Sequence, residues 1–263
     1  MTPLEHALER TVLICATRKT VFRFFTDSAR FADWWGAGSS IEARPGGAVR
    51  IRYPNGVVAS GAVLEVVADE RIVFTYGYDA PDKPIPPGGS RVIITLRDHE
   101  AGTLLELRHE MADAATRDHH VPGWRHQLAL FAVAAAREQH RDAAGVIDRY
   151  LALWSEPDPA ARRVALAALV TDDVVFRDAF GCTRGRDELD LHIAAAQMHM
   201  PDMRLGREGD ARQCQGTAIA DWAALAADGA PRAHGTNVFE LAPDGRIARV
   251  VGFWRAAGQG SAA

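Results

Sequence analysis

Residues 174–180 read Val-Val-Phe-Arg-Asp-Ala-Phe. Their content of β-branched and aromatic residues predicts a strand. Because side chains alternate along a strand, Val174, Phe176, Asp178 and Phe180 share one face, which we expect to point inward. Asp178 is then a lone carboxylate among apolar side chains. Desolvation at such a position makes a carboxylate a better base when it ionises, so Asp178 is a candidate general base.

Helices precede this strand, and further strands follow it. The predicted helices cover residues 146–154, 161–169 and 187–198, and the predicted strands cover 211–225, 233–241 and 246–254. Pro243-Asp244-Gly245 predicts a hairpin turn between the last two strands. Helices followed by a sheet predict an α+β cone-shaped barrel for this half of the chain.

The preceding half has a different order of elements. Strands are predicted at 11–16, 49–53, 57–67, 71–78, 91–97 and 103–111, with short helices at 20–25 and 29–35. Val121, Trp124, Leu128, Phe131 and Ala135 recur at helical spacing and predict a long amphipathic helix. We therefore predict a two-domain α+β protein with domains 1–140 and 141–263 and a boundary within 138–142.

Composition excludes several classes of function. Thirty Lys and Arg residues against 34 Asp and Glu residues give a net charge of −4, without the basic excess of a nucleic-acid-binding protein. No apolar run approaches the ~20 residues that span a bilayer, and the N-terminus lacks the pattern of a signal peptide. The widely spaced Cys15, Cys182 and Cys214 form no metal motif. We expect a cytoplasmic protein with no metal, no cofactor, and neither nucleic acid nor membrane as partner.

A series of short motifs runs in order through residues 8–136. They are 20–25, Phe31, Trp34-Trp35-Gly36, Arg44-Pro45-Gly46-Gly47, 61–67, Asp69-Glu70-Arg71-Ile72 and Gly123-Trp124. On these motifs the segment resembles the START-like (SRPBCC) superfamily, in its branch related to activators of the heat-shock chaperone ATPase. The resemblance implies a helix-grip fold, whose sheet and long C-terminal helix enclose a ligand cavity. We predict that the inward-facing His109 and Trp124 contact this ligand, although His109 also fits a hydrogen-bonded core histidine.

Two more polar residues of the second half are expected to face inward. Tyr150 lies on the apolar helix face between Ile147 and Trp154, and Asn237 aligns with Phe239 in its strand. Polar groups on an otherwise apolar lining are typical of a ligand pocket. The predicted lining residues are Trp154, Phe176, Phe180, Trp222 and Phe239.

Residues 142–255 resemble the SnoaL-like and ketosteroid-isomerase-like branch of the nuclear transport factor two fold. The resemblance rests on Tyr150, Asp178 and Asn237, and it implies that Asp178 moves a proton next to a carbonyl while Tyr150 and Asn237 stabilise the oxyanion. Two residues depart from the family pattern. Asn237 replaces a carboxylic acid but still donates from its amide, and Ala179 stands where proline is common.

Two functions therefore remain open. The first is a cofactor-free isomerase, cyclase or dehydratase that acts on a small apolar or polyketide-like molecule. The second is a ligand-binding or chaperone-associated protein without turnover, in which Asp178 bonds nearby backbone, Arg177 or Arg184. The resemblance also implies a homodimer.

Three further residues of this half have no assigned role. His192 and His199 share a helix face without a third metal ligand. Trp254, like Trp222, fits either a pocket wall or a dimer interface.

Overall fold

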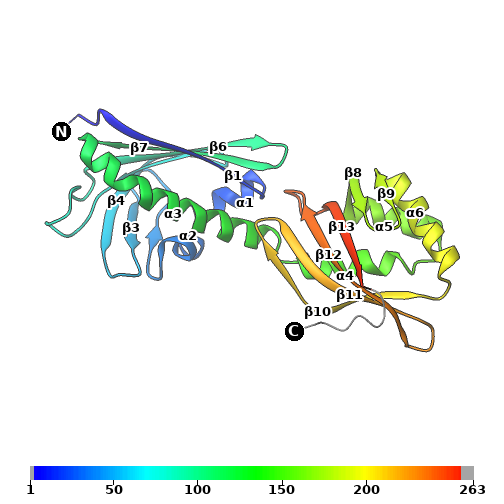
Figure 1. Ribbon diagram of the computed structural model, residues 1–263. Helices are drawn as coiled ribbons and strands as arrows, with labels where there is room; N and C mark the ends of the chain where they lie inside the picture. Colours follow the sequence, from blue (N-terminus) through cyan, green and yellow to red (C-terminus); the bar gives the residue numbers. More distant parts are fainter. Residues whose placement is uncertain (1–2, 256–263) are drawn as a thin grey trace. The chain divides into compact units, whose positions relative to one another are not determined.

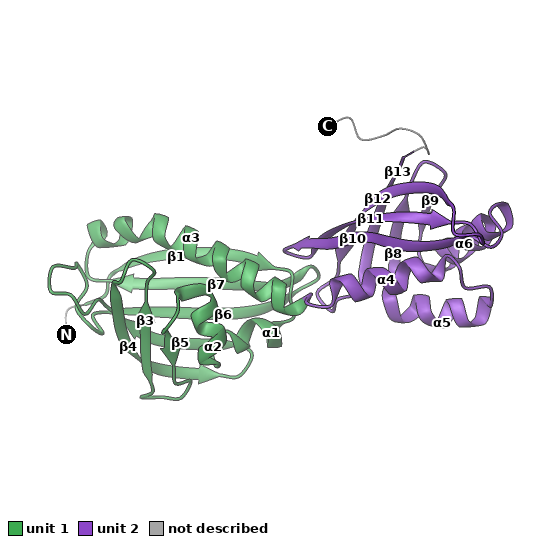
Figure 2. Ribbon diagram, turned by 90° about the horizontal axis from the view of Figure 1, so that it is seen from below, with its two compact units in different colours: residues 1–139 green, residues 140–263 purple. Residues whose placement is uncertain are grey.

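After Gln139 the chain passes from one folded unit to a second (Figure 2). The computed structural model describes residues 3–255. Each unit has its own cluster of buried apolar side chains, so each satisfies its hydrophobic faces internally. The protein is thus an α+β protein of two domains.

The first unit is a seven-stranded antiparallel sheet with one long helix. Its elements are β1 (His6–Ile14), α1 (Arg18–Arg23), α2 (Ser28–Trp35), β2 (Ser40–Ile41), β3 (Ala48–Arg52), β4 (Val58–Val67), β5 (Arg71–Tyr76), β6 (Ser90–His99), β7 (Gly102–Met111) and α3 (Ala114–Gln139). The strand order is β1-β7-β6-β5-β4-β3-β2, so the first strand pairs with the last. The helix α3 lies across the sheet and packs on β1 and β7 (Figure 1).

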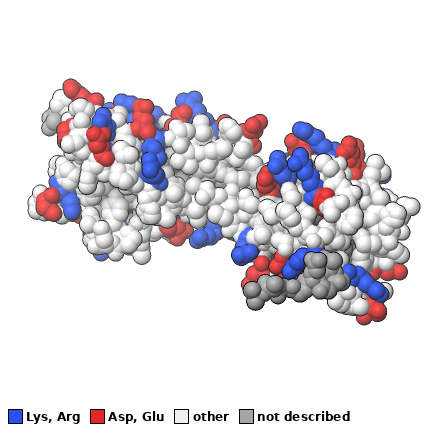
Figure 3. Space-filling model, in the orientation of Figure 1, with Lys and Arg blue, Asp and Glu red and all other residues white. Residues whose placement is uncertain are grey.

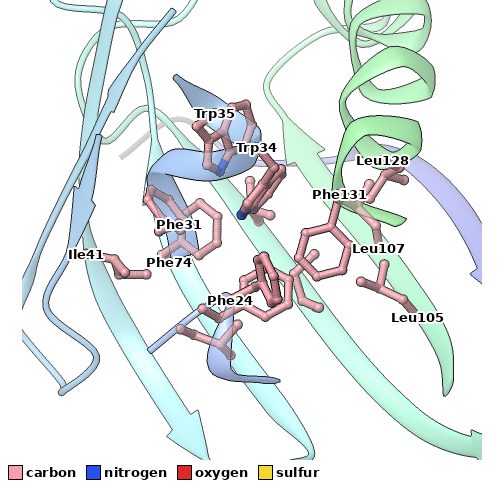
Figure 4. Packing of buried hydrophobic residues seen from close by; sticks show 14 of the residues in the cluster. Phe24, Phe31, Trp34, Trp35, Ile41, Phe74, Leu105, Leu107, Leu128 and Phe131 are labelled. Carbon is pink, nitrogen blue, oxygen red and sulfur yellow. The ribbon is translucent and has the colours of Figure 1, made fainter. Parts of the chain in front are cut away.

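Aromatic residues fill the space between this helix and the sheet. Phe131 of α3 meets Trp34 of α2 edge to face, with ring centroids 4.8 Å apart, and stacks on Phe25 at 5.0 Å. Figure 4 shows Phe131 and Leu128 facing the α2 tryptophans and Phe24. Such contacts add to the energy of apolar burial and fix how α3 sits on the sheet.

The helix α3 begins earlier than the apolar spacing predicts. The carboxylate of Asp113 accepts the backbone N–H and the hydroxyl of Thr116, both at 2.8 Å. This N-terminal cap satisfies donors that otherwise lack partners, and the same bonds lower the pKa of Asp113. The helix therefore includes Pro122, which the apolar pattern placed at its start.

The second unit has three helices and a six-stranded mixed sheet. Its elements are α4 (Ala143–Leu153), α5 (Pro159–Leu169), β8 (Val170–Arg177), β9 (Cys182–Arg184), α6 (Arg186–His199), β10 (Arg204–Cys214), β11 (Thr217–Leu225), β12 (Pro231–Leu241) and β13 (Ile247–Arg255). The strand order is β10-β11-β12-β13-β8-β9, and the β13–β8 pair is parallel. The helices pack on the sheet, α4 on β10 and both α5 and α6 on β8.

The prediction of one strand over 211–225 is wrong. The chain reverses at Gln215 and Gly216, which have φ values of 48° and 85°. Two consecutive residues at positive φ form the type of tight turn that joins antiparallel strands. The segment is therefore split between β10 and β11, and the sheet gains a strand.

A buried ion pair joins α5 to α6. Arg162 Nε donates to Asp190 Oδ1 at 2.6 Å, and the two side chains are only 3% and 6% exposed. Arg163 donates to the other carboxylate oxygen at 2.9 Å. Burial opposes ionisation of Asp190, but the bonds from Arg163 and Arg162 outweigh it and lower the pKa of this carboxyl. The packing of α6 on α5 thus depends on the Arg162–Asp190 ion pair, and removing one partner would leave a buried charge that destabilises the fold.

Acidic and basic side chains are interspersed on the face shown in Figure 3. This agrees with the small net charge of the sequence. Within residues 3–255, no helix combines the length and apolarity needed to cross a membrane.

Candidate functional site

A cavity of about 420 Å³ opens in the second unit. Its polar lining includes Asp178, Asn237 and His192. The rest of its wall is mostly apolar and consists of Trp154, Phe176, Phe180, Ala195, Ala196, His199, Met200, Leu205, Trp222, Gly252 and Trp254. An apolar cavity with a few converging polar groups is the usual form of a small-molecule site.

Asp178 stands one residue beyond the end of β8. Its Oδ1 accepts the backbone N–H groups of Phe180 at 2.8 Å and Gly181 at 2.7 Å, and its Oδ2 accepts the indole N–H of Trp254 at 3.0 Å. No ion pair joins it to Arg177 or Arg184 within the described part of the chain. The carboxylate is therefore oriented by neutral donors, and Oδ2 keeps a lone pair for a ligand.

The structure fixes which end of the Asn237 amide faces the cavity. Asn237 is 7% exposed, and its Oδ1 accepts the indole N–H of Trp222 at 2.9 Å. An indole nitrogen only donates, so the acceptor must be the amide oxygen. The Asn237 NH₂ group bonds none of the residues 3–255, which leaves it as a donor toward the cavity.

Gly252 brings these two side chains together. It lies opposite Asn237 in the β12–β13 register. A Cβ built on it would lie 3.0 Å from Asn237 Oδ1 and 3.2 Å from Asp178 Cβ. Because both approaches are tighter than ordinary contacts, a glycine here permits the amide and the carboxylate to share one wall.

Tyr150 and Phe239 lie behind the cavity wall. Both are fully buried, with ring centroids 5.7 Å apart in an edge-to-face arrangement. The Tyr150 hydroxyl makes no hydrogen bond with the described residues. Burial raises the pKa of Tyr150, the nearby Trp154 indole partly opposes this effect, and the negative charge of Asp178 adds to it, so the hydroxyl keeps its proton. Of the three predicted catalytic residues, the structure brings Asp178 and Asn237 to the cavity and leaves Tyr150 in the core.

The other predicted lining residues of this unit, Trp154, Phe176, Phe180 and Trp222, all border the cavity. Trp254 does so as well, with its ring 4.8 Å from that of Trp222. The sequence pattern did not identify Gly252 or Leu205, because their place depends on strand register and on packing across the sheet. No group of three or more His, Cys, Asp or Glu residues in the described ranges is arranged to hold a metal ion.

The first unit contains a second cavity, of about 280 Å³. Its wall consists of Trp35, Tyr53, Tyr76, Tyr78, His119, His120, Gly123, Trp124, His126 and Gln127. The predicted contact Trp124 is thus on the wall, whereas His109 is fully buried behind it.

His109 is held as a neutral histidine. Trp124 donates its indole N–H to His109 Nδ1 at 2.9 Å, and Nε2 lies 2.8 Å from the Ser90 hydroxyl. Since Nδ1 accepts, the ring proton is on Nε2 and is donated to Ser90. Burial lowers the pKa of His109 to about 3, with a smaller effect from His120. His109 therefore positions Trp124 from behind the cavity wall.

Two family models match the chain. The model described as activator of Hsp90 ATPase homolog 1-like protein (AHSA1) matches residues 15–136, and the SnoaL-like domain matches residues 147–250. Among curated proteins, none matches.

Similar solved structures each correspond to one half of the chain. A candidate isomerase of the SnoaL-like family from Agrobacterium tumefaciens is 28% identical and covers 45% of this chain and 99% of its own, with a TM-score of 0.42. An AHSA1-like protein from Rhizobium etli is 29% identical and covers 51% of this chain and 84% of its own, with a TM-score of 0.40. A protein from Chromobacterium violaceum is 27% identical over 48% of this chain and 94% of its own, with a TM-score of 0.40. On the two family matches, the protein consists of an N-terminal AHSA1-like domain followed by a C-terminal SnoaL-like domain.

Proposed function

We propose that the SnoaL-like domain is a cofactor-free enzyme that moves a proton next to the carbonyl group of a small apolar or polyketide-like molecule. The observation that supports this is the shared wall at Gly252. There a carboxylate with an open lone pair and an amide NH₂ without a protein partner face one apolar cavity. Both groups are held by indole N–H donors, so they are oriented before a ligand binds.

In the proposed reaction the substrate carbonyl oxygen accepts a hydrogen bond from the Asn237 NH₂ group. Asp178 Oδ2 removes a proton from the carbon next to the carbonyl, and the electrons of the C–H bond form an enolate. Asn237 stabilises the oxygen, where the negative charge collects. The protonated Asp178 then returns its proton to the same carbon or to a conjugated one. A general base contributes ~10²–10⁴-fold and one oxyanion donor ~10²–10³-fold.

The test is proton exchange on benzylacetone in heavy water, followed by NMR at the methylene next to the carbonyl. We expect the wild-type chain to catalyse exchange and Asp178→Asn to lower the rate by ~10²-fold or more. Asp173→Asn, which changes an exposed carboxylate of β8, the strand that ends just before Asp178, is the matched control. Equal exchange rates for wild type and Asp178→Asn, or no catalysis by either, would reject the proposal.

The second candidate is a binding protein without turnover. It is favoured by the three N–H donors that already bond Asp178, since a carboxylate with three partners also fits a structural role. Calorimetric titration with benzylacetone distinguishes the two candidates. Binding by wild type without any proton exchange would support the binding protein.

For the AHSA1-like domain we propose a ligand role for its aromatic cavity. Three tyrosines and two tryptophans on the wall offer apolar area together with hydroxyl groups. Tyr53 and Tyr76 share a hydrogen bond of 2.8 Å, and Tyr78 lies 3.0 Å from His120 Nε2. Quenching of tryptophan fluorescence by an added aromatic ketone, smaller in Trp124→Leu than in the wild type, is the expected result.

A further inference from the structure

His192 of α6 borders the same cavity as Asp178 and Asn237. Its ring packs against two aromatic side chains that also contact each other, with its centroid 5.8 Å from that of Trp154 and 5.1 Å from that of Phe176. Neither ring nitrogen forms a hydrogen bond with any residue of the described part of the chain. The imidazole is therefore held in place by packing, and its nitrogens stay free for a ligand.

Gly181 permits the close approach of His192 to the Asp178 turn. A Cβ on Gly181 would lie 2.4 Å from His192 Cε1, which real side chains do not allow. The N–H of the same glycine donates to Asp178 Oδ1 at 2.7 Å. The imidazole and the carboxylate are thus neighbours, yet no ion pair within 4.0 Å joins them in the described residues. Each group is free to act on a different atom of one bound molecule.

We infer that His192 is a catalytic acid and that the site eliminates water from β-hydroxy carbonyl compounds. This inference rests on the proposed function, since Asp178 and Asn237 keep the roles given above. It adds a third group and narrows the substrate class to compounds with a hydroxyl on the second carbon from the carbonyl.

The elimination is balanced without a cofactor. Asp178 takes the proton from the carbon next to the carbonyl, and Asn237 stabilises the enolate oxygen. When the enolate re-forms the carbonyl, its electrons make the new C=C bond and the C–O bond to the hydroxyl breaks. His192 donates a proton to the departing oxygen, so that water leaves and a conjugated enone remains. Proton transfer from the protonated Asp178 to the imidazole, through solvent, restores both groups.

A proton shift within one substrate needs a single carboxylate, which takes and returns the proton. When a hydroxyl must leave, a second group is needed to protonate its oxygen, because hydroxide is a poor leaving group. That group must also take up a proton again before the next reaction. Imidazole is the side chain suited to that exchange near neutral pH. The ring nitrogens of His192 suit this role, because they bond neither Asp178 nor another described residue and can reach the departing hydroxyl oxygen.

The experiment compares two probes that differ by one hydroxyl group. The aldol adduct of benzaldehyde and acetone reports elimination, through the absorbance of benzalacetone. Benzylacetone lacks the hydroxyl and reports only proton exchange at the methylene. Both are measured with the full-length wild type, His192→Asn, His192→Gln and Asp178→Asn. His99→Asn, at the exposed last residue of β6 in the other domain, is the matched control.

We expect wild type to catalyse both reactions, and we expect His192→Asn to slow elimination by ~10²–10⁴-fold relative to benzylacetone exchange. Asp178→Asn should lose both. His192→Gln, which keeps the side-chain volume, should behave like His192→Asn, and unchanged melting curves exclude misfolding.

Three results overturn the inference: wild-type exchange without elimination, elimination that His192→Asn and His192→Gln leave intact, or an equal loss of exchange and elimination in the folded His192 variants. A wild type that exchanges no proton at all, or an Asp178→Asn variant that exchanges normally, instead overturns the proposed function.

Discussion

The pairing of Asn237 with Trp222 allows the structural role of the amide to be separated from its catalytic role. Asn237→Leu removes the acceptor of the Trp222 indole N–H and leaves that donor in a side chain only 3% exposed. A buried donor without a partner costs ~1–3 kcal/mol. For a domain of this size, about 3–5 °C of melting temperature corresponds to each kcal/mol. We therefore expect the second domain to melt roughly 3–15 °C lower.

The double variant Trp222→Phe with Asn237→Leu should recover most of this loss, because replacing both partners of a hydrogen bond by apolar groups is close to neutral. Activity should not recover. Both Asn237→Leu and the double variant lose the NH₂ donor, and removing one oxyanion donor lowers kcat by ~10²–10³-fold.

The assay combines scanning calorimetry of the full chain with the benzylacetone exchange rate. It compares wild type, Asn237→Leu, Trp222→Phe and the double variant. If the double variant regains both its melting temperature and its exchange rate, Asn237 serves only to satisfy Trp222. An oxyanion donor at position 237 would then be refuted.

Three other predictions concern stability and assembly. Asp190→Asn leaves Arg162 buried without its charged partner and should cost ~3–5 kcal/mol by calorimetry, whereas Asp187→Asn at an exposed position of the same helix should cost far less. The native pKa of Asp190 lies below the ordinary value of 3.8, so its stabilisation is present above pH 3.8 and disappears as the pH falls through the native pKa. The melting temperature of Asp190→Asn should therefore change less with pH in acid than that of the wild type. His109 has a native pKa of about 3 against 6.5 when unfolded, so the first domain should lose stability as the pH falls from 6.5 toward 3, and His109→Gln should weaken that dependence. The resemblance to SnoaL-like proteins predicts a homodimer, and light scattering that gives the 28.5 kDa mass of one chain would count against it.

Local sequence pattern was enough to predict the class of each half and to identify its main polar residues. Alternation along 174–177 and the apolar face around Tyr150 depend on local periodicity, which the chain carries without knowledge of its partners. The prediction of a strand over 174–180 is wrong at its end, because β8 stops at Arg177, so that Asp178 lies in the segment that follows and Phe180 is 73% exposed. The same holds for the long helix with Trp124, although its start depended on the cap at Asp113. Local pattern also placed Asn237 toward the interior, where the structure has it.

The contacts that those residues make depend on the folded arrangement of distant segments. Asp178 receives the indole N–H of Trp254, which is 76 positions away in the chain, and Gly252 meets Asn237 because of the β12–β13 register. Tyr150 shares an apolar helix face with Trp154, yet Trp154 alone of the two borders the cavity among the described residues. Periodicity predicts which face of a helix or strand is apolar. Strand register, turns and helix packing determine which residues that face contacts. For that reason the candidate base could be identified from the sequence, while the site around it, including His192, required the fold.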